Sequence, residues 1–161
     1  MLRMLFLVGL LSLSLSAHSE ETAINIKELV LEKEGAFFVF YLQGSPYSGS
    51  AVQYNDAGIK IYEGIFKDGK DHGPATRWYD DGSKKSQTSL KEGKLHGTII
   101  EWYENGNKKF EASFEEGIQN GTRTKWYEDG KKYREENYIL GRKTYEKEWD
   151  KNGKLTKNLE F

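Results

Sequence analysis

The chain has 161 residues, with 24 basic and 25 acidic side chains and a formal net charge of −1. This near balance argues against nucleic acid as the main partner, because neutralising phosphates requires a basic surface. The absence of cysteine excludes disulfides, thiol catalysis and zinc–thiolate sites. A composition with 14% aromatic residues and 17 glycines favours an ordered, turn-rich structure over a disordered chain.

Residues 1–17 are predicted to form a signal peptide. Arg3 supplies a short basic region, residues 4–13 supply an apolar region, and small residues suited to cleavage follow. The apolar run is shorter than the about 20 residues that a transmembrane helix needs. We therefore expect the protein to be exported to the periplasm, the cell envelope or the medium. An uncleaved anchor or a buried terminal segment is the alternative.

The rest of the chain is organised by a repeat of 24 residues. Residues 18–48 form an N-terminal segment with a degenerate opening repeat, and residues 49–161 form the array. Glycines recur at fixed offsets, but the fifth unit is one residue short and has Thr144 where glycine is expected. A fixed period of this length is typical of repeat architectures. The units of the array are residues 49–72, 73–96, 97–120, 121–143 and a partial unit, 144–161.

Each unit is predicted to be a β-hairpin. In the third unit, the strand-like stretches "TIIEWY" and "KKFEASF" flank the turn-like "ENGN". Asn-Gly and Asp-Gly are the preferred pairs for a two-residue type I′ turn, in which both central residues have positive φ. Such a turn would place Tyr79 opposite Lys84 and Trp78 opposite Lys85. The pairs in the middle turns are Ala57-Gly58, Asp81-Gly82, Asn105-Gly106, Asp129-Gly130 and Asn152-Gly153.

Strand alternation then assigns side chains to the two faces of the sheet. In the second unit, one face carries Trp78, Thr76 and Gln87. The other face carries Tyr79, Arg77, Ser86, Thr88 and Leu90. Neither face is fully apolar, whereas a two-layer sandwich needs one dry face. The predicted fold is therefore all-β: an elongated single-layer antiparallel meander of stacked β-hairpins, stabilised mainly by contacts between neighbouring repeats.

The recurring pattern of glycines and a Trp-Tyr pair resembles the MORN-repeat variant family, and in particular the YwqK-type antitoxin proteins of bacteria. The resemblance covers about residues 26–161. It implies a protein that binds and neutralises a partner toxin, or a scaffold, and it brings no catalytic residues. An antitoxin role implies a cytoplasmic protein, whereas an immunity role in the envelope is compatible with export. The residues that carry the pattern are Gly73, Trp78, Tyr79, Gly82, Gly93 and Gly97, with their equivalents in the next units.

Enzymatic and metal sites are not expected. His72 and His96 occupy equivalent positions, which stacked repeats place about 10 Å apart, too far for one zinc ion. Asn120 at the third such position favours a turn role for all three. Carboxylate pairs such as Glu135/Glu136 are expected in turns or on wet strands, where nothing separates their pKa values. We therefore predict no enzyme, no cofactor and no metal.

The aromatic residues divide into a structural set and a candidate binding set. One tryptophan per unit is interpreted as packing between hairpins, together with the recurring glycines. The tyrosines share a face with the positions where the units differ most, which is typical of a surface that recognises a partner. A solvated face with local ion pairs is the alternative. The structural set is Trp78, Trp102, Trp126, Trp149, Gly73, Gly97, Gly121, Gly82, Gly106 and Gly130. The candidate binding set is Tyr79, Tyr103, Tyr127, Arg77, Glu101 and Lys125.

The predicted function is that of a non-enzymatic, exported repeat protein that acts as a protein-binding module or an envelope scaffold, including an immunity-like role. The alternative is a cytoplasmic antitoxin of the YwqK type, and a third class is a hydrolase or lectin that uses a groove. The expected partner is a protein, such as a toxin or an envelope protein. Nucleic acid and membrane contact are not expected, and the open edge of the sheet can pair with a second copy.

Overall fold

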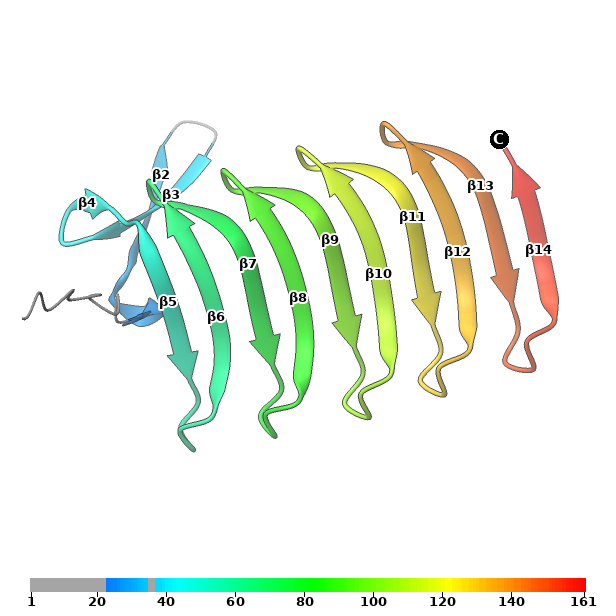
Figure 1. Ribbon diagram of the computed structural model, residues 1–161, viewed down its shortest axis with the longest axis horizontal. Helices are drawn as coiled ribbons and strands as arrows, with labels where there is room; N and C mark the ends of the chain where they lie inside the picture. The colour runs from blue at the N-terminus through cyan, green and yellow to red at the C-terminus, as the bar shows by residue number, and fades with distance from the viewer. Residues whose placement is uncertain (1–22, 35–36) are drawn as a thin grey trace, which may run out of the picture.

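The structure, a computed structural model, describes residues 23–34 and 37–161 (Figure 1). The predicted signal peptide lies outside these residues. A short 3₁₀ turn, η1 (Ile26–Glu28), joins two sheets. The small sheet contains β2 (Val30–Glu34), β3 (Phe37–Leu42) and β4 (Ser45–Pro46). The large sheet contains β1 (Ile24–Asn25), β5 (Gly49–Tyr54), β6 (Lys60–Lys67), β7 (Lys70–Trp78), β8 (Lys84–Lys91), β9 (Lys94–Trp102), β10 (Lys108–Glu115), β11 (Ile118–Trp126), β12 (Lys132–Ile139), β13 (Arg142–Trp149) and β14 (Leu155–Glu160).

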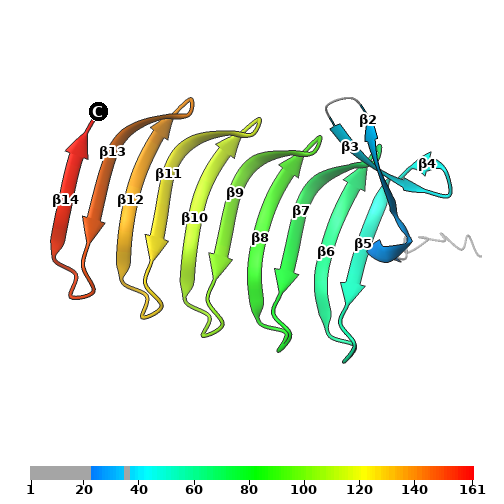
Figure 2. The ribbon, with the colours of Figure 1, turned by 180° about the vertical axis from the view of Figure 1, so that it is seen from behind.

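The large sheet is a single-layer antiparallel meander, as predicted. From β5 to β14 each strand pairs with the next one along the chain, and β1 adds a short parallel pair to β5. The views from the two sides show the same row of hairpins with no second layer over the array in the described part of the chain (Figures 1 and 2). No helix among residues 23–34 and 37–161 is long and apolar enough to span a bilayer.

The middle turns differ from the predicted type I′ turns. Gly82 has φ +85°, but Asp81 does not have positive φ. The Gly82 N–H donates to the Tyr79 carbonyl at 3.0 Å, and the Tyr79 N–H donates to the Ser83 carbonyl at 2.8 Å. This pattern is a three-residue loop, a type I turn followed by glycine in the left-handed region, and it repeats in all five middle turns. The prediction of two-residue turns at these positions was therefore wrong.

The longer loop also shifts the predicted register. Trp78 pairs with Lys84, and the register shifts between Arg77 and Trp78. Lys85 is the extra residue at this bulge, so Lys84 and Lys85 point to opposite faces of the sheet. The predictions that Trp78 lies opposite Lys85 and that Tyr79 lies opposite Lys84 are both wrong for this reason. Further from the turn, Thr76 pairs with Gln87, as the predicted faces require.

Two-residue turns with positive φ at both central residues occur at the other end of the hairpins. There the first central residue has φ between 48° and 51°, and the glycine that follows has φ between 74° and 82°. Both values are typical of type I′ turns, whose twist matches that of the strands. The pairs are Asp68-Gly69, Glu92-Gly93, Glu116-Gly117 and Leu140-Gly141.

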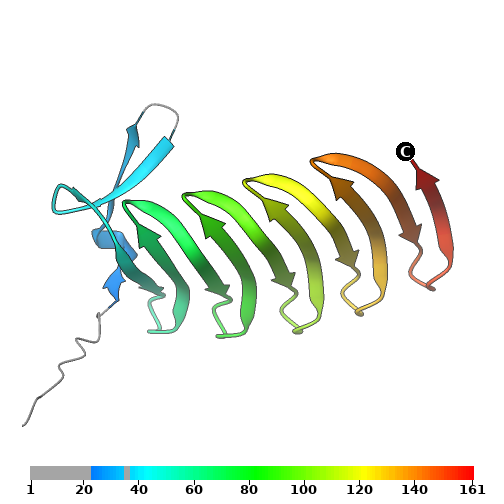
Figure 3. The same ribbon diagram turned by 45° about the horizontal axis from the view of Figure 1, so that its top comes forward.

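Bulges near the starts of the odd-numbered strands bend the sheet. Between the pairs Gly64–Ala75 and Phe66–Asp71, β7 has two more residues than β6. The same excess recurs in β9 and β11, but β13 has only one extra residue, Thr144. This missing residue accounts for the step from Gly121 to Thr144, which is 23 residues instead of 24. Bulged strands bend and twist more strongly, and the curved strands in Figure 3 show this bending.

The small sheet docks on the first unit of the array, where the densest apolar packing of the described chain lies. Phe66 is 2% exposed, and its ring lies 4.9 Å from the ring of Phe40 and 5.9 Å from that of Tyr47. The Phe40 N–H donates to the Gly69 carbonyl at 2.7 Å, and the Gly69 N–H donates to the Tyr47 carbonyl at 2.8 Å. The N-terminal segment thus forms a sheet of its own that covers one end of the array.

Candidate binding face

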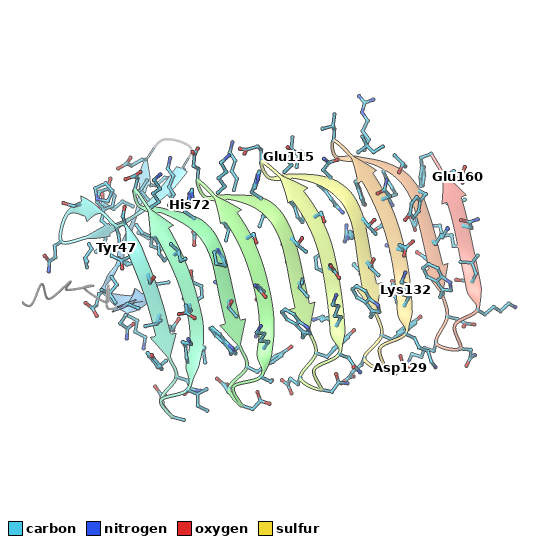
Figure 4. All side chains as sticks on the ribbon, viewed as in Figure 1. Tyr47, His72, Glu115, Asp129, Lys132 and Glu160 are labelled. Carbon is cyan, nitrogen blue, oxygen red and sulfur yellow. The ribbon has the colours of Figure 1, made fainter. Side chains whose placement is uncertain are left out.

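One face of the array, here called the tryptophan face, carries a lysine–tryptophan pair at each junction between units. A lysine ammonium lies 4.8–5.9 Å from the centroid of the tryptophan ring on the following strand. Lys132, which is labelled in Figure 4, also pairs with the carboxylate of Glu135 at 2.5 Å. Cation–π contacts at exposed sites are worth about 0.5–1 kcal/mol, so the ladder stabilises each junction between units. The pairs are Lys60–Trp78, Lys84–Trp102, Lys108–Trp126 and Lys132–Trp149.

The opposite face, here called the tyrosine face, carries Tyr79, Tyr103 and Tyr127. Their hydroxyls donate to the backbone carbonyls of the tryptophans in the next unit, at distances of 2.8, 2.8 and 3.0 Å. Burial, followed by the charge of Glu104, raises the pKa of the Tyr79 phenol. Burial, followed by Glu128, does the same to the pKa of Tyr103. The three rings are held in fixed orientations by hydroxyls that bridge consecutive units.

Cations or a further aromatic ring lie against these tyrosines. The Lys85 ammonium lies 5.2 Å from the Tyr79 ring centroid, and the Lys109 ammonium lies 5.7 Å from that of Tyr103. In the fourth unit the equivalent residue is Tyr133, whose ring lies 5.3 Å from the ring of Tyr127. Sequence reasoning missed these three residues. The signal was the lysine doublet at residues 84–85 and 108–109, but the predicted register placed the second lysine on the tryptophan face. In the fourth unit the doublet lies one residue earlier, at residues 131–132.

The first hollow on the tyrosine face has a volume of about 630 Å³. Arg77, Tyr79 and Lys85 line it together with three acidic residues of the turns, Asp80, Asp81 and Glu104. The guanidinium of Arg77 also lies 5.0 Å from the centroid of the buried Tyr62 ring. Two of the predicted binding residues, Arg77 and Tyr79, are thus brought together, in surroundings of mixed charge.

The second hollow has a volume of about 290 Å³ and is richer in cations. Its lining has three cations, four aromatic side chains and a single carboxylate. The Arg123 guanidinium lies 5.6 Å from the ring of Phe110 and pairs with the carboxylate of Glu136 at 3.5 Å, but its buried Nε makes no hydrogen bond. No ion pair joins Lys109 or Lys125 to a carboxylate among residues 23–34 and 37–161. The lining residues are Glu101, Tyr103, Lys109, Phe110, Arg123, Lys125, Trp126 and Tyr133.

The structure thus brings three more of the predicted binding residues, Glu101, Tyr103 and Lys125, into one hollow. Tyr127 lies outside both hollows, against Tyr133. Strand alternation assigns Phe110 to this face, but neither Phe110 nor Arg123 was among the predicted binding residues. The position of Arg123 is aliphatic or small in the two preceding units, where it is Ile99 and Ala75.

A buried ionic cluster occupies the C-terminal end of the tyrosine face. Glu136 and Glu146 are 2% and 3% exposed, and the Lys143 ammonium pairs with both, at 2.8 and 2.5 Å. Lys157 pairs with Glu146 at 2.7 Å, and Arg134 pairs with Glu146 at 3.1 Å. Hydrogen bonds from Lys143 and Lys157 lower the pKa of Glu146 to about 2. The expectation that Glu136 lies on a wet strand is therefore wrong.

The histidines lie apart from one another along the array. His96 faces the carboxylate of Glu116, with 3.5 Å between Nδ1 and Oε1. Within the described residues, no group of three or more histidine, aspartate or glutamate side chains is arranged to hold a metal ion.

The repeat pattern finds a match among known protein families. Residues 95–116 and 119–139 match the MORN repeat variant. These two MORN-variant repeats cover β9 with β10 and most of β11 with β12, the part of the array that contains the second hollow. No curated protein matches the sequence.

Solved structures with a similar arrangement include a crystal structure of TarM, with a TM-score of 0.33 and 14% identity. A mutant of S. aureus TarM in complex with Fondaparinux, alpha-GlcNAc-glycerol and UDP has a TM-score of 0.30 and 12% identity. In both comparisons the match covers 83% of this chain and spans 22% of the length of the TarM chain.

Proposed function

We propose that this chain is a non-enzymatic repeat module that binds a partner protein with its tyrosine face. The observation that carries the proposal is the contrast between the two faces. The tryptophan face has the same lysine–tryptophan pair at each junction between units, whereas the tyrosine face has Arg77, Glu101 and Lys125 at equivalent positions. The fold needs the constant residues at every junction. The variable positions are free of that requirement and can determine which partner binds.

The tyrosine face also has the physical features of a binding surface. Its rings are anchored by the phenol–carbonyl bonds between units, so little side-chain entropy would be lost on binding. Aromatic and arginine side chains are enriched at the centres of protein interfaces, and both kinds line the two hollows. The match of two units to the MORN repeat variant is consistent with a repeat protein of this kind.

Two cellular roles are compatible with this binding mode. The N-terminal pattern with Arg3 favours an exported module, such as an envelope scaffold or an immunity-like protein. The resemblance to YwqK-type antitoxins favours a cytoplasmic protein that neutralises a toxin. Cell fractionation and sequencing of the mature N-terminus separate the two roles, because an intact Met1 in the cytosol would exclude export.

Photo-crosslinking tests which face is used, and the chain offers a matched control. A benzophenone side chain is placed at Lys85 or Lys109 on the tyrosine face, and at the adjacent Lys84 or Lys108 on the tryptophan face. In the native cell, we expect a crosslinked partner protein from Lys85 and Lys109 only. The proposal fails if the partner crosslinks from the tryptophan face, or if all four positions give no crosslinked product.

A further inference from the structure

The geometry points to a specific chemistry for the second hollow: we propose that it binds an extended acidic segment of the partner, with carboxylates at alternating positions. This inference rests on the proposed function and adds the kind of sequence that the partner presents. The hollow lies between the third and fourth units, and three of its lining side chains, Lys109, Arg123 and Lys125, are cations, against the single carboxylate of Glu101.

The spacing of these cations matches an extended peptide. Arg123 and Lys125 are two residues apart on β11 and face the same side, and Tyr127 follows them with the same step. Two residues of a strand span about 6.6 Å, which is also the distance between same-side side chains of an extended peptide. A segment Glu-x-Glu-x-Phe that lies along β11 therefore places its carboxylates at Arg123 and Lys125. Its aromatic ring then meets the Tyr127–Tyr133 pair.

Two of the three cations are available to a ligand. Arg123 is already paired with the buried carboxylate of Glu136, with 3.5 Å between Nε and Oε2, but its buried Nε makes no hydrogen bond. Lys109 and Lys125 form no ion pair within the described residues. Charged groups in a half-enclosed hollow are screened less by solvent and salt than those on an open surface. An incoming carboxylate is therefore attracted more strongly here than elsewhere on the sheet.

The other units do not present this row. On β7, β9 and β11 the three same-face positions before the middle turn end in tyrosine, but only β11 has cations at both preceding positions. A partner that requires two alternating carboxylates is thus directed to one place on the array. The rows are Ala75–Arg77–Tyr79 on β7, Ile99–Glu101–Tyr103 on β9 and Arg123–Lys125–Tyr127 on β11.

Fluorescence anisotropy with purified full-length protein tests the inference. The probe is the fluorescein-labelled peptide Ser-Glu-Ser-Glu-Ser-Phe-Ser, and its isomer Ser-Glu-Glu-Ser-Ser-Phe-Ser has the same charge but consecutive carboxylates. We expect the alternating peptide to bind about tenfold more tightly than the isomer, with an affinity that falls as salt rises. The double variant Lys109→Glu and Lys125→Glu should weaken its binding about tenfold or more.

The control variant is Lys94→Glu with Lys154→Glu, which changes the net charge equally at exposed lysines outside the hollow. Its affinity should stay within about twofold of the parent protein. Equal binding of the two peptides, or equal losses in the two double variants, would show non-specific charge attraction and overturn the inference. A heparin-derived oligosaccharide that binds the hollow while the alternating peptide does not would overturn it as well.

The two proposals can fail separately. If the tyrosine face crosslinks a partner but the alternating peptide does not bind, the acidic segment is wrong and the proposed function stands. If the alternating peptide binds at Lys109 and Lys125 but no partner crosslinks from the tyrosine face in the cell, the proposed function fails.

Discussion

The phenol–carbonyl bonds between units offer the most direct test of how the array holds together. Each of Tyr79, Tyr103 and Tyr127 donates one hydrogen bond of 2.8–3.0 Å to a carbonyl 22 or 23 residues later in the chain. The triple variant with phenylalanine at these positions removes the three donors and keeps the rings. A hydrogen bond of this kind contributes about 0.5–1.5 kcal/mol to stability.

The three sites are about 10 Å apart, so their effects should add approximately. We expect the triple variant to lose about 3 kcal/mol of unfolding free energy, a large part of the about 5–15 kcal/mol typical of folded proteins. Urea unfolding followed by tryptophan fluorescence measures this loss. Tyr54→Phe is the control, because Tyr54 is 47% exposed and should give no change.

A triple variant within about 0.5 kcal/mol of the parent would refute this reasoning, because the bonds would then contribute nothing measurable. The raised pKa values of Tyr79 and Tyr103 provide a second readout. The stability that a raised phenol pKa contributes is fully present below pH about 10, and it is lost as the pH rises through the pKa of the phenol in the folded protein. The triple variant should therefore lose less stability than the parent above pH about 10.

Three further predictions concern turns and charges. Gly69→Ala should lower the free energy of unfolding, measured by urea titration, by about 2–5 kcal/mol, and Gly117→Ala should lower it by only about 1–2 kcal/mol. The two differ because a Cβ at Gly69 would meet Val39 and backbone atoms of β3, whereas a Cβ at Gly117 would meet no backbone atom. Leu140→Gly should raise the melting temperature, because it relieves a leucine with φ +48° in an exposed turn. The pKa of Glu146 is lowered to about 2, so the free energy of unfolding should fall as the pH drops below about 4.5. Glu146→Gln should make this fall smaller. Urea titrations at several pH values measure it.

The period and the meander could be predicted because glycine recurs wherever the backbone turns through positive φ. The type of turn could not be predicted from the same residues. Asp81-Gly82 suits a type I′ turn, but a type I turn with a bulge also requires glycine at that position. The choice between them shifts the register by one residue. That shift moved Lys85 to the tyrosine face and hid its contact with Tyr79.

The tyrosines and their variable neighbours could be assigned to one face from the sequence because they recur with the period. The buried state of Glu136 and Glu146 could not be predicted, because their partners come from neighbouring strands. Lys143 and Lys157 each lie on a different strand from at least one of the carboxylates that they neutralise. A glutamate is rarely buried without such partners, so its burial depends on pairings that one strand's sequence does not contain.

The bond from each tyrosine to the next unit has a consequence for how the array can change in length. Removal of residues 97–120 would bring the Tyr79 phenol to the carbonyl of Trp126 in place of Trp102, so the new junction would have the same chemistry as the old one. Each such step shortens the sheet by two strands, or about 10 Å. The reach of the array and the identity of its variable side chains can therefore be altered independently, by duplication or loss of whole units.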